Sequence, residues 1–214
     1  VSMNGGPERR VFEAHKDDYV REVRDPLLRF IANLAPKLKT ISPHIVADPR
    51  PNGGSMFRIY RDVRFSKDKR PYKTAASAYF RHAAGKDVHA PGYYLHLGPK
   101  TVYMGAGIWQ PDAGALAAIR NAIVESPAAY KRTSSSKAFR ETMRPGGESL
   151  KRPPRGFDPD HPLIEELKRK DFVCFREFTH AEAGSANFEN DFLAGCRTAK
   201  PLMKFITGAL DLEF

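Results

Sequence analysis

The sequence predicts an α+β fold: a central, mainly antiparallel sheet built from hairpins and packed with N-terminal, middle and C-terminal helices. Three observations predict it. Apolar residues recur every three or four positions near both ends and in the middle of the chain, which is typical of helices with one buried face. Alternating apolar and polar residues flank Gly- and Pro-containing turns, which is typical of β-hairpins. The elements follow in the order helix, strands, helices, strand, helix, which favours this fold over a doubly wound parallel sheet.

The helical pattern is longest in residues 8–38, where apolar side chains recur as one stripe. Pro26 interrupts the stripe and predicts a kink or two abutting helices near Asp25. Later helices are expected to begin at Asp112, Ser126, Asp160 and Asn187. Pro201 is expected to divide the last of them.

The strongest strand pattern lies in residues 57–65, where apolar and charged residues alternate. Further strands are predicted over residues 75–81 and 171–178, a short strand or extended piece over residues 41–47, and a hairpin over residues 92–109. Gly105 and Gly107 in the returning strand of that hairpin indicate a bulge, or a close approach by a backbone or a ligand. They do not match the dinucleotide fingerprint, because no third glycine follows at the required spacing.

A length of 214 residues suits one domain, which we place at residues 7–214, with residues 1–6 as a cloning remnant or a disordered start. No apolar run approaches the length of a membrane span, and the opening residues lack the basic start and apolar core of a signal peptide. Cys174 is expected to be a buried thiol, and a disulfide with Cys196 stays open. We therefore expect a reducing, cytoplasmic setting and no membrane partner.

The formal net charge is +10, and the excess is concentrated in two segments. Residues 58–73 hold seven Lys or Arg and two Asp, and residues 131–155 hold eight Lys or Arg and two Glu. A charge run is most often a solvated loop. Two local clusters are nevertheless more informative about an anionic partner than a diffuse excess.

Arg61 is the exception on the apolar side of residues 57–65. Because a guanidinium does not lose its proton, it needs a carboxylate such as Asp62 or Asp68, a bound anion, or a place at the rim of the sheet. Tyrosines interleave with basic residues here, and arginine, lysine and tyrosine side chains together bind phosphate or carboxylate well. We predict a basic, tyrosine-lined pocket for a small anion, with the ligand-binding residues Arg61, Arg64, Lys67, Tyr72, Lys73 and Tyr94. His96, on the Tyr94 side of its strand, is the candidate catalytic acid or base.

Two motifs that suggest other chemistry lack the residues they require. Ser66 and Lys69 match S-x-x-K, but the S-D-N and K-T-G motifs that accompany it in penicillin-recognising enzymes are absent. His82, His89 and His96 lie seven apart, but glycine and proline break the chain between them and no carboxylate or cysteine set accompanies them. Neither a metal nor a cofactor is predicted.

Three separated motifs resemble, in the same order, a bacterial and fungal family catalogued as domain of unknown function 2461: FRIYRDVRFSKDKRPYKT, GYYLHLGP followed by GAGIWQP, and LKRPPRGFDPDHP. The resemblance runs from about Phe12 to the C-terminus. The opening departs, since GGPERRVF stands where family members carry a longer aromatic-rich segment. Because the family has no established activity, the resemblance implies a domain and assigns no role to Arg61, Lys73 or His96.

Three functions remain in competition. The first is a binding or catalytic pocket for a small anionic ligand. The second is a nucleic-acid-binding module that uses both basic segments and exposed tyrosines. The third is an interaction protein whose basic loops, such as residues 150–162, meet an acidic partner. The sequence leaves open whether the protein is an enzyme and what its oligomeric state is.

Overall fold

The structure is a computed structural model that describes residues 7–65, 67–85 and 89–214. The expectation for residues 1–6 and the serine of the S-x-x-K match therefore lie outside the described residues. The helices are α1 (Pro7–Ala14), α2 (Lys16–Tyr19), the π-helical turn η1 (Val20–Arg24), α3 (Asp25–Ile41), α4 (Ala113–Glu125), α5 (Pro127–Thr133), α6 (Lys137–Thr142), α7 (Ile164–Leu167), α8 (His180–Ala183) and α9 (Phe188–Ala209).

Five strands form one sheet in the order β1-β2-β3-β5-β4, and all neighbours are antiparallel. They are β1 (Ala76–Arg81), β2 (Gly92–Leu97), β3 (Val102–Ile108), β4 (Arg144–Gly146) and β5 (Phe172–Phe178). The hairpin predicted over residues 92–109 is β2 and β3. The α+β class with an antiparallel sheet and N-terminal, middle and C-terminal helices is confirmed.

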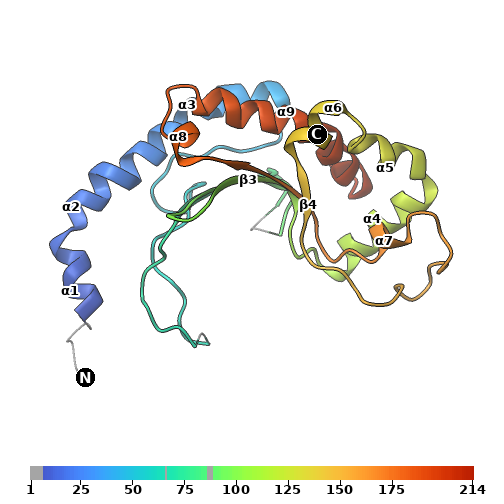
Figure 1. Ribbon diagram of the computed structural model, residues 1–214, viewed down its shortest axis with the longest axis horizontal. Helices are drawn as coiled ribbons and strands as arrows, with labels where there is room; N and C mark the ends of the chain where they lie inside the picture. The colour runs from blue at the N-terminus through green and yellow to red at the C-terminus, as the bar shows by residue number, and fades with distance from the viewer. Residues whose placement is uncertain (1–6, 66, 86–88) are drawn as a thin grey trace.

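Helices α3 and α9 cover one face of the sheet (Figure 1). Phe80 of β1 and Phe192 of α9 are fully buried there, with ring centroids 5.6 Å apart. Tyr93 of β2 donates a hydrogen bond from its hydroxyl to the carbonyl oxygen of Cys196, at 3.2 Å. Each large apolar side chain buried between these helices and the sheet contributes roughly 1.5–3 kcal/mol to the stability of the fold. This packing fixes the sheet against the helices and leaves its opposite face available. Cys174 and Cys196 are both free thiols, and burial raises the pKa of Cys174 to about 12.

The N-terminal helical stretch is broken where Pro26 predicts a break. The chain passes from α2 through the π-helical turn η1 into α3, whose second residue is Pro26. A proline has no N–H to donate, so it is tolerated in the first turn of a helix and disrupts bonding before it. The expected kink is confirmed in the form of this turn.

Two predictions about later helices are wrong. Asp160 does not cap a helix, because α7 begins only at Ile164 and residues 158–163 form turns. Pro201 does not divide the C-terminal helix, since α9 is continuous from Phe188 to Ala209. A proline inside a helix costs about 3 kcal/mol, which burial of apolar residues on both sides of Pro201 offsets.

The prediction of a central strand over residues 57–65 is also wrong. Residues 57–65 and 67–73 instead form a hairpin-like arm, called the arm below, that leaves the edge of the sheet (Figure 1). Its two sides are joined by an isolated bridge between Tyr60 and Tyr72 and by hydrogen bonds of 2.8 Å from Arg61 N to Pro71 O and from Lys73 N to Ile59 O. Charged side chains on one side of the arm remain exposed to solvent, whereas most side chains on the other side are partly buried. The alternation in residues 57–65 therefore reflects the two sides of this arm and not a strand inside the sheet.

Residues 41–47, predicted as a strand or extended piece, contribute only an isolated bridge between Ile45 and His82. None of the helices in the described ranges unites the length and the apolar composition that a bilayer crossing requires.

Candidate functional site

The sheet has a second face, called the open face below, that points away from α3 and α9. Strand register aligns its side chains in rows across the sheet. One row holds Tyr79, Tyr94, Gly105 and Phe175, and the next holds Ser77, His96 and Tyr103. Because side chains alternate between faces along a strand, the residues between these positions belong to the buried core.

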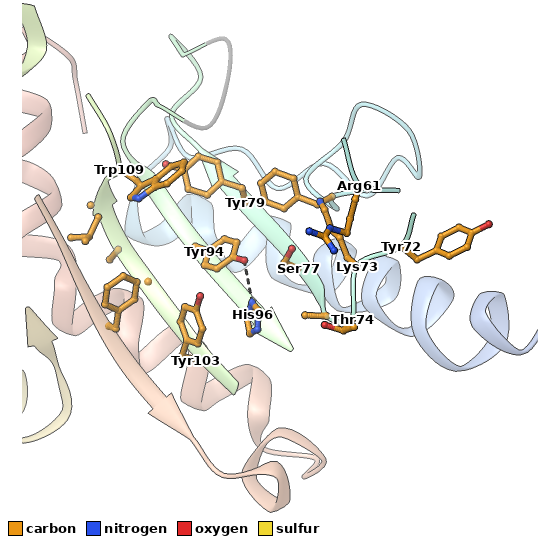
Figure 2. Close-up of a pocket in the computed structure, with 18 of the residues that line it drawn as sticks. Arg61, Tyr72, Lys73, Thr74, Ser77, Tyr79, Tyr94, His96, Tyr103 and Trp109 are labelled. Carbon is orange, nitrogen blue, oxygen red and sulfur yellow. Dashed lines mark hydrogen bonds between the residues drawn. The ribbon is translucent and has the colours of Figure 1, made fainter. Parts of the chain in front are cut away.

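A cleft of about 740 Å³ lies between the open face and the arm. Figure 2 shows Trp109 at one end of it, Arg61 and Lys73 at the other, and Tyr94 and His96 between them. The residues that form the cleft come from segments far apart in the chain, which is why the fold must be complete before the site exists. Clefts of this size are ordinary for small-molecule ligands.

Aromatic rings form most of the floor. The His96 and Tyr103 rings are stacked with centroids 4.7 Å apart, and the Tyr103 and Phe175 rings meet edge to face at 5.5 Å. Phe57 of the arm approaches Tyr94 at 6.2 Å, also at a steep angle. These contacts fix the rings in place, so the floor is preorganised.

Two glycines of β3 line the cleft for different reasons, and Gly105 is the one that lies between Tyr94 and Phe175. A Cβ atom on Gly105 would lie 3.1 Å from the Phe175 ring. Gly107 has a φ of +130°, and a Cβ atom there would lie 1.9 Å from the carbonyl oxygen of Phe172. Gly105 therefore leaves room on the open face, whereas Gly107 is required by the backbone itself.

The cationic end of the cleft begins with a shared carboxylate on the arm. Nη1 of Arg61 donates to Oδ2 of Asp68 at 2.5 Å, and Nη2 of Arg70 donates to the same oxygen at 2.7 Å. The Arg70 and Arg61 hydrogen bonds hold the pKa of Asp68 well below its usual range. Two guanidinium groups therefore share this one carboxylate beside the cleft.

Lys73 supplies the other cation. Its Nζ lies over the Phe57 ring, 5.0 Å from the centroid, and it forms no salt bridge with a carboxylate in the described part of the chain. Burial, aided by the positive charge of Arg58, lowers the pKa of Lys73. A half-buried ammonium without a carboxylate partner is costly, and a bound anion would offset that cost.

His96 and Tyr94 are joined at the centre of the cleft, where the Tyr94 hydroxyl lies 3.2 Å from Nδ1 of His96. Burial lowers the pKa of His96, which favours the neutral imidazole. When the Tyr94 hydroxyl donates to Nδ1, the imidazole carries its proton on Nε2. Burial, with Tyr94 nearby, also raises the pKa of Tyr103 to about 12, so this hydroxyl stays protonated.

The fold brings Arg61, Lys73, Tyr94 and His96 around the one cleft. Tyr72 borders it, but its ring stacks on Phe12 of α1 with centroids 4.3 Å apart and points away from the cleft in Figure 2.

Arg64 and Lys67, which we predicted to bind the ligand, do not line the cleft. Both are exposed, and Arg64 hydrogen-bonds Asp62 through Nε and Nη2 at 2.7–3.2 Å. The reason is local: both residues lie beyond the last hydrogen-bonded pair of the arm, Arg61 and Pro71, where their side chains are exposed to solvent.

Sequence reasoning missed several residues of the cleft, namely Ser77, Tyr79, Tyr103, Trp109 and Phe175. A signal for some of them was present. Continuing the alternation that placed Tyr94 and His96 puts Tyr103 and Gly105 on one side of the returning strand. Phe175 had no such signal, because only the pairing of β3 with β5 brings it beside Gly105.

Within the described ranges, no group of three or more His, Cys, Asp or Glu side chains is arranged to hold a metal ion. The residues that line the cleft offer stacking on aromatic rings, hydrogen bonding from tyrosine and histidine, and attraction of an anion.

Comparison with known proteins identifies a family for the chain. The family described as conserved hypothetical protein (DUF2461) matches residues 6–205. No curated protein and no solved structure matches the chain significantly.

Proposed function

This chain belongs to the DUF2461 family of conserved hypothetical proteins, and we propose that it binds a small molecule bearing a phosphate or carboxylate group in the cleft between the arm and the open face. Lys73 holds the anion, with Arg61 beside it. The observation that carries the proposal is the half-buried Lys73 ammonium at the cleft, which forms no salt bridge with a described carboxylate.

Three features support this function. An ammonium that is partly desolvated gains more from an anion than one in bulk water, because the local dielectric constant is lower. The Arg61 guanidinium lies at the same end of the cleft, where it shares Asp68 with Arg70. The His96 imidazole and the Tyr94 hydroxyl lie further into the cleft and can bond a polar ligand.

A catalytic role for His96 stays a prediction, as do the nucleic-acid and acidic-partner alternatives. The cytoplasmic setting expected from the sequence suits the proposal, since phosphorylated and carboxylated metabolites are abundant ligands there and both buried thiols would stay reduced.

The test is calorimetry and thermal unfolding with inorganic phosphate and with citrate at constant ionic strength. Both probes bind the wild-type chain in the expected result, and Lys73→Met weakens phosphate binding by roughly tenfold or more, which is the usual contribution of a charge-assisted hydrogen bond. Lys67→Met is the matched control, because Lys67 is an exposed lysine of the same arm that does not line the cleft.

Two results reject the proposal. One is that neither probe binds or raises the melting temperature. The other is that Lys67→Met weakens binding as much as Lys73→Met does, since this would mean that diffuse charge on the arm attracts the anion.

A further inference from the structure

The residues that line the cleft change in chemical character from one end to the other. Their order indicates which groups the ligand carries in addition to its anion. Figure 2 shows the progression from Trp109, through the hydroxyl and imidazole groups of Tyr94, Tyr103 and His96, to Lys73. The inference below rests on the proposed function for the Lys73 end and concerns the other two parts.

Three aromatic side chains, Trp109, Tyr79 and Phe175, line one end of the cleft. Trp109 is 47% exposed, and one face of its indole is stacked on His89 with centroids 5.9 Å apart. The Phe175 and Tyr79 rings lie close on the sheet backbone, because the positions beneath them are glycine: a Cβ atom on Gly92 would lie 2.8 Å from Cζ of Tyr79. Aromatic side chains at the end of a cleft favour a ligand with a planar ring, which can stack on them.

The middle of the cleft is polar. Tyr94 and Tyr103 are neighbours with ring centroids 5.8 Å apart, and the Tyr94 hydroxyl also contacts His96. Ser77 is the cross-strand partner of His96 on the same face. Hydroxyl and imidazole groups at this place suit a ligand that carries hydroxyl groups between its ring and its anion.

The geometry points to a nucleoside monophosphate as the ligand class: a planar base at the Trp109 end, a sugar over Tyr94, Tyr103 and His96, and a phosphate at Lys73. A planar ring, a hydroxyl-bearing linker and a phosphate follow one another in this ligand class in the same order as the three parts of the cleft.

The experiment compares four probes by calorimetry: adenosine 5′-monophosphate, uridine 5′-monophosphate, ribose 5-phosphate and inorganic phosphate. At least one nucleotide should bind about tenfold more tightly than ribose 5-phosphate, which is the usual contribution of one stacked base. Trp109 is the single tryptophan of the chain, so its fluorescence reports on the ring end alone. The nucleotide should quench this fluorescence, whereas ribose 5-phosphate should bind without changing it.

Variants separate the two ends of the cleft. Trp109→Ala should weaken nucleotide binding about tenfold and leave ribose 5-phosphate unchanged, whereas Lys73→Met should weaken both. Phe65→Ala is the matched control, since Phe65 is an aromatic residue that is 94% exposed and does not line the cleft. Circular dichroism and a thermal melt establish that each variant is folded.

Equal affinity for the nucleotides and ribose 5-phosphate, or an equal effect of Trp109→Ala on both, overturns the inference and leaves the proposed function standing. Absence of binding by all four phosphate compounds overturns the inference, and it overturns the proposed function as well when citrate also fails to bind. Nucleotide binding that Lys73→Met does not weaken also overturns the inference, because the phosphate would then lie elsewhere.

Discussion

Nη1 of Arg61 lies 2.5 Å from Oδ2 of Asp68, so the arginine on the apolar side of the arm reaches the cleft with a carboxylate already bound. Arg70 bonds the same carboxylate. The carboxylate therefore holds the arm in shape and also competes with any anion that enters the cleft.

Asp68→Asn should strengthen phosphate binding, by about threefold or more, because it removes a negative charge beside the anion site and releases Arg61. Calorimetry at low ionic strength measures the change. Asp62→Asn is a matched control: Asp62 bonds Arg64 two residues along, as Asp68 bonds Arg70, but neither residue of that pair lines the cleft. An equal gain in both variants would show that the effect is one of overall charge.

Anion affinity should fall as the pH rises through the pKa of Lys73, which burial places below the ordinary value of 10.5. The sign follows from the charge: the ammonium attracts the anion and the neutral amine does not. A phosphate ligand keeps its charge over the interval from pH 8 to pH 10.5, so the loss reports on the protein. Lys73→Arg should bind phosphate without this loss, because a guanidinium stays charged throughout. A parallel decline in wild type and Lys73→Arg would assign the effect to another group.

The two glycines of β3 should respond differently to alanine. Gly107→Ala should lower the free energy of unfolding by roughly 2–4 kcal/mol, since it forces a side chain onto a positive-φ backbone and against Phe172. Gly105→Ala should cost about 1 kcal/mol or less, because its Cβ displaces only the edge of the Phe175 ring. Urea unfolding at pH 7 compares the two. Equal losses would contradict the separate roles assigned to these glycines.

The helices and the β2–β3 hairpin were predictable because their patterns are local. The capping residue Asp112 shows this: its side chain accepts a hydrogen bond from the N–H of Ala115, three residues away. Pro26 likewise predicts a break in the N-terminal helix, and the break forms as the π-helical turn η1 directly before α3. Interactions between residues three or four apart depend little on the rest of the fold.

Residues 57–65 show where this reasoning fails. Their alternation predicts one apolar and one charged side, and it cannot tell a strand inside a sheet from an arm that leaves it. The difference depends on the partner: residues 59–61 bond residues 71–73 of the same arm, and Tyr72 packs on Phe12 of α1. Both contacts depend on how the chain folds back on itself.

From its sequence alone, this protein could be assigned its fold class, most helix starts, the hairpin, its family resemblance and the positive charge of the segment that holds Arg61 and Lys73. Only the tertiary structure decided which basic side chains of that segment line the cleft. It also decided that Phe175 and Trp109 line the same cleft. The physical reason is that periodicity specifies which side of an element is buried, whereas a cleft is made by elements whose separation in space no local pattern encodes.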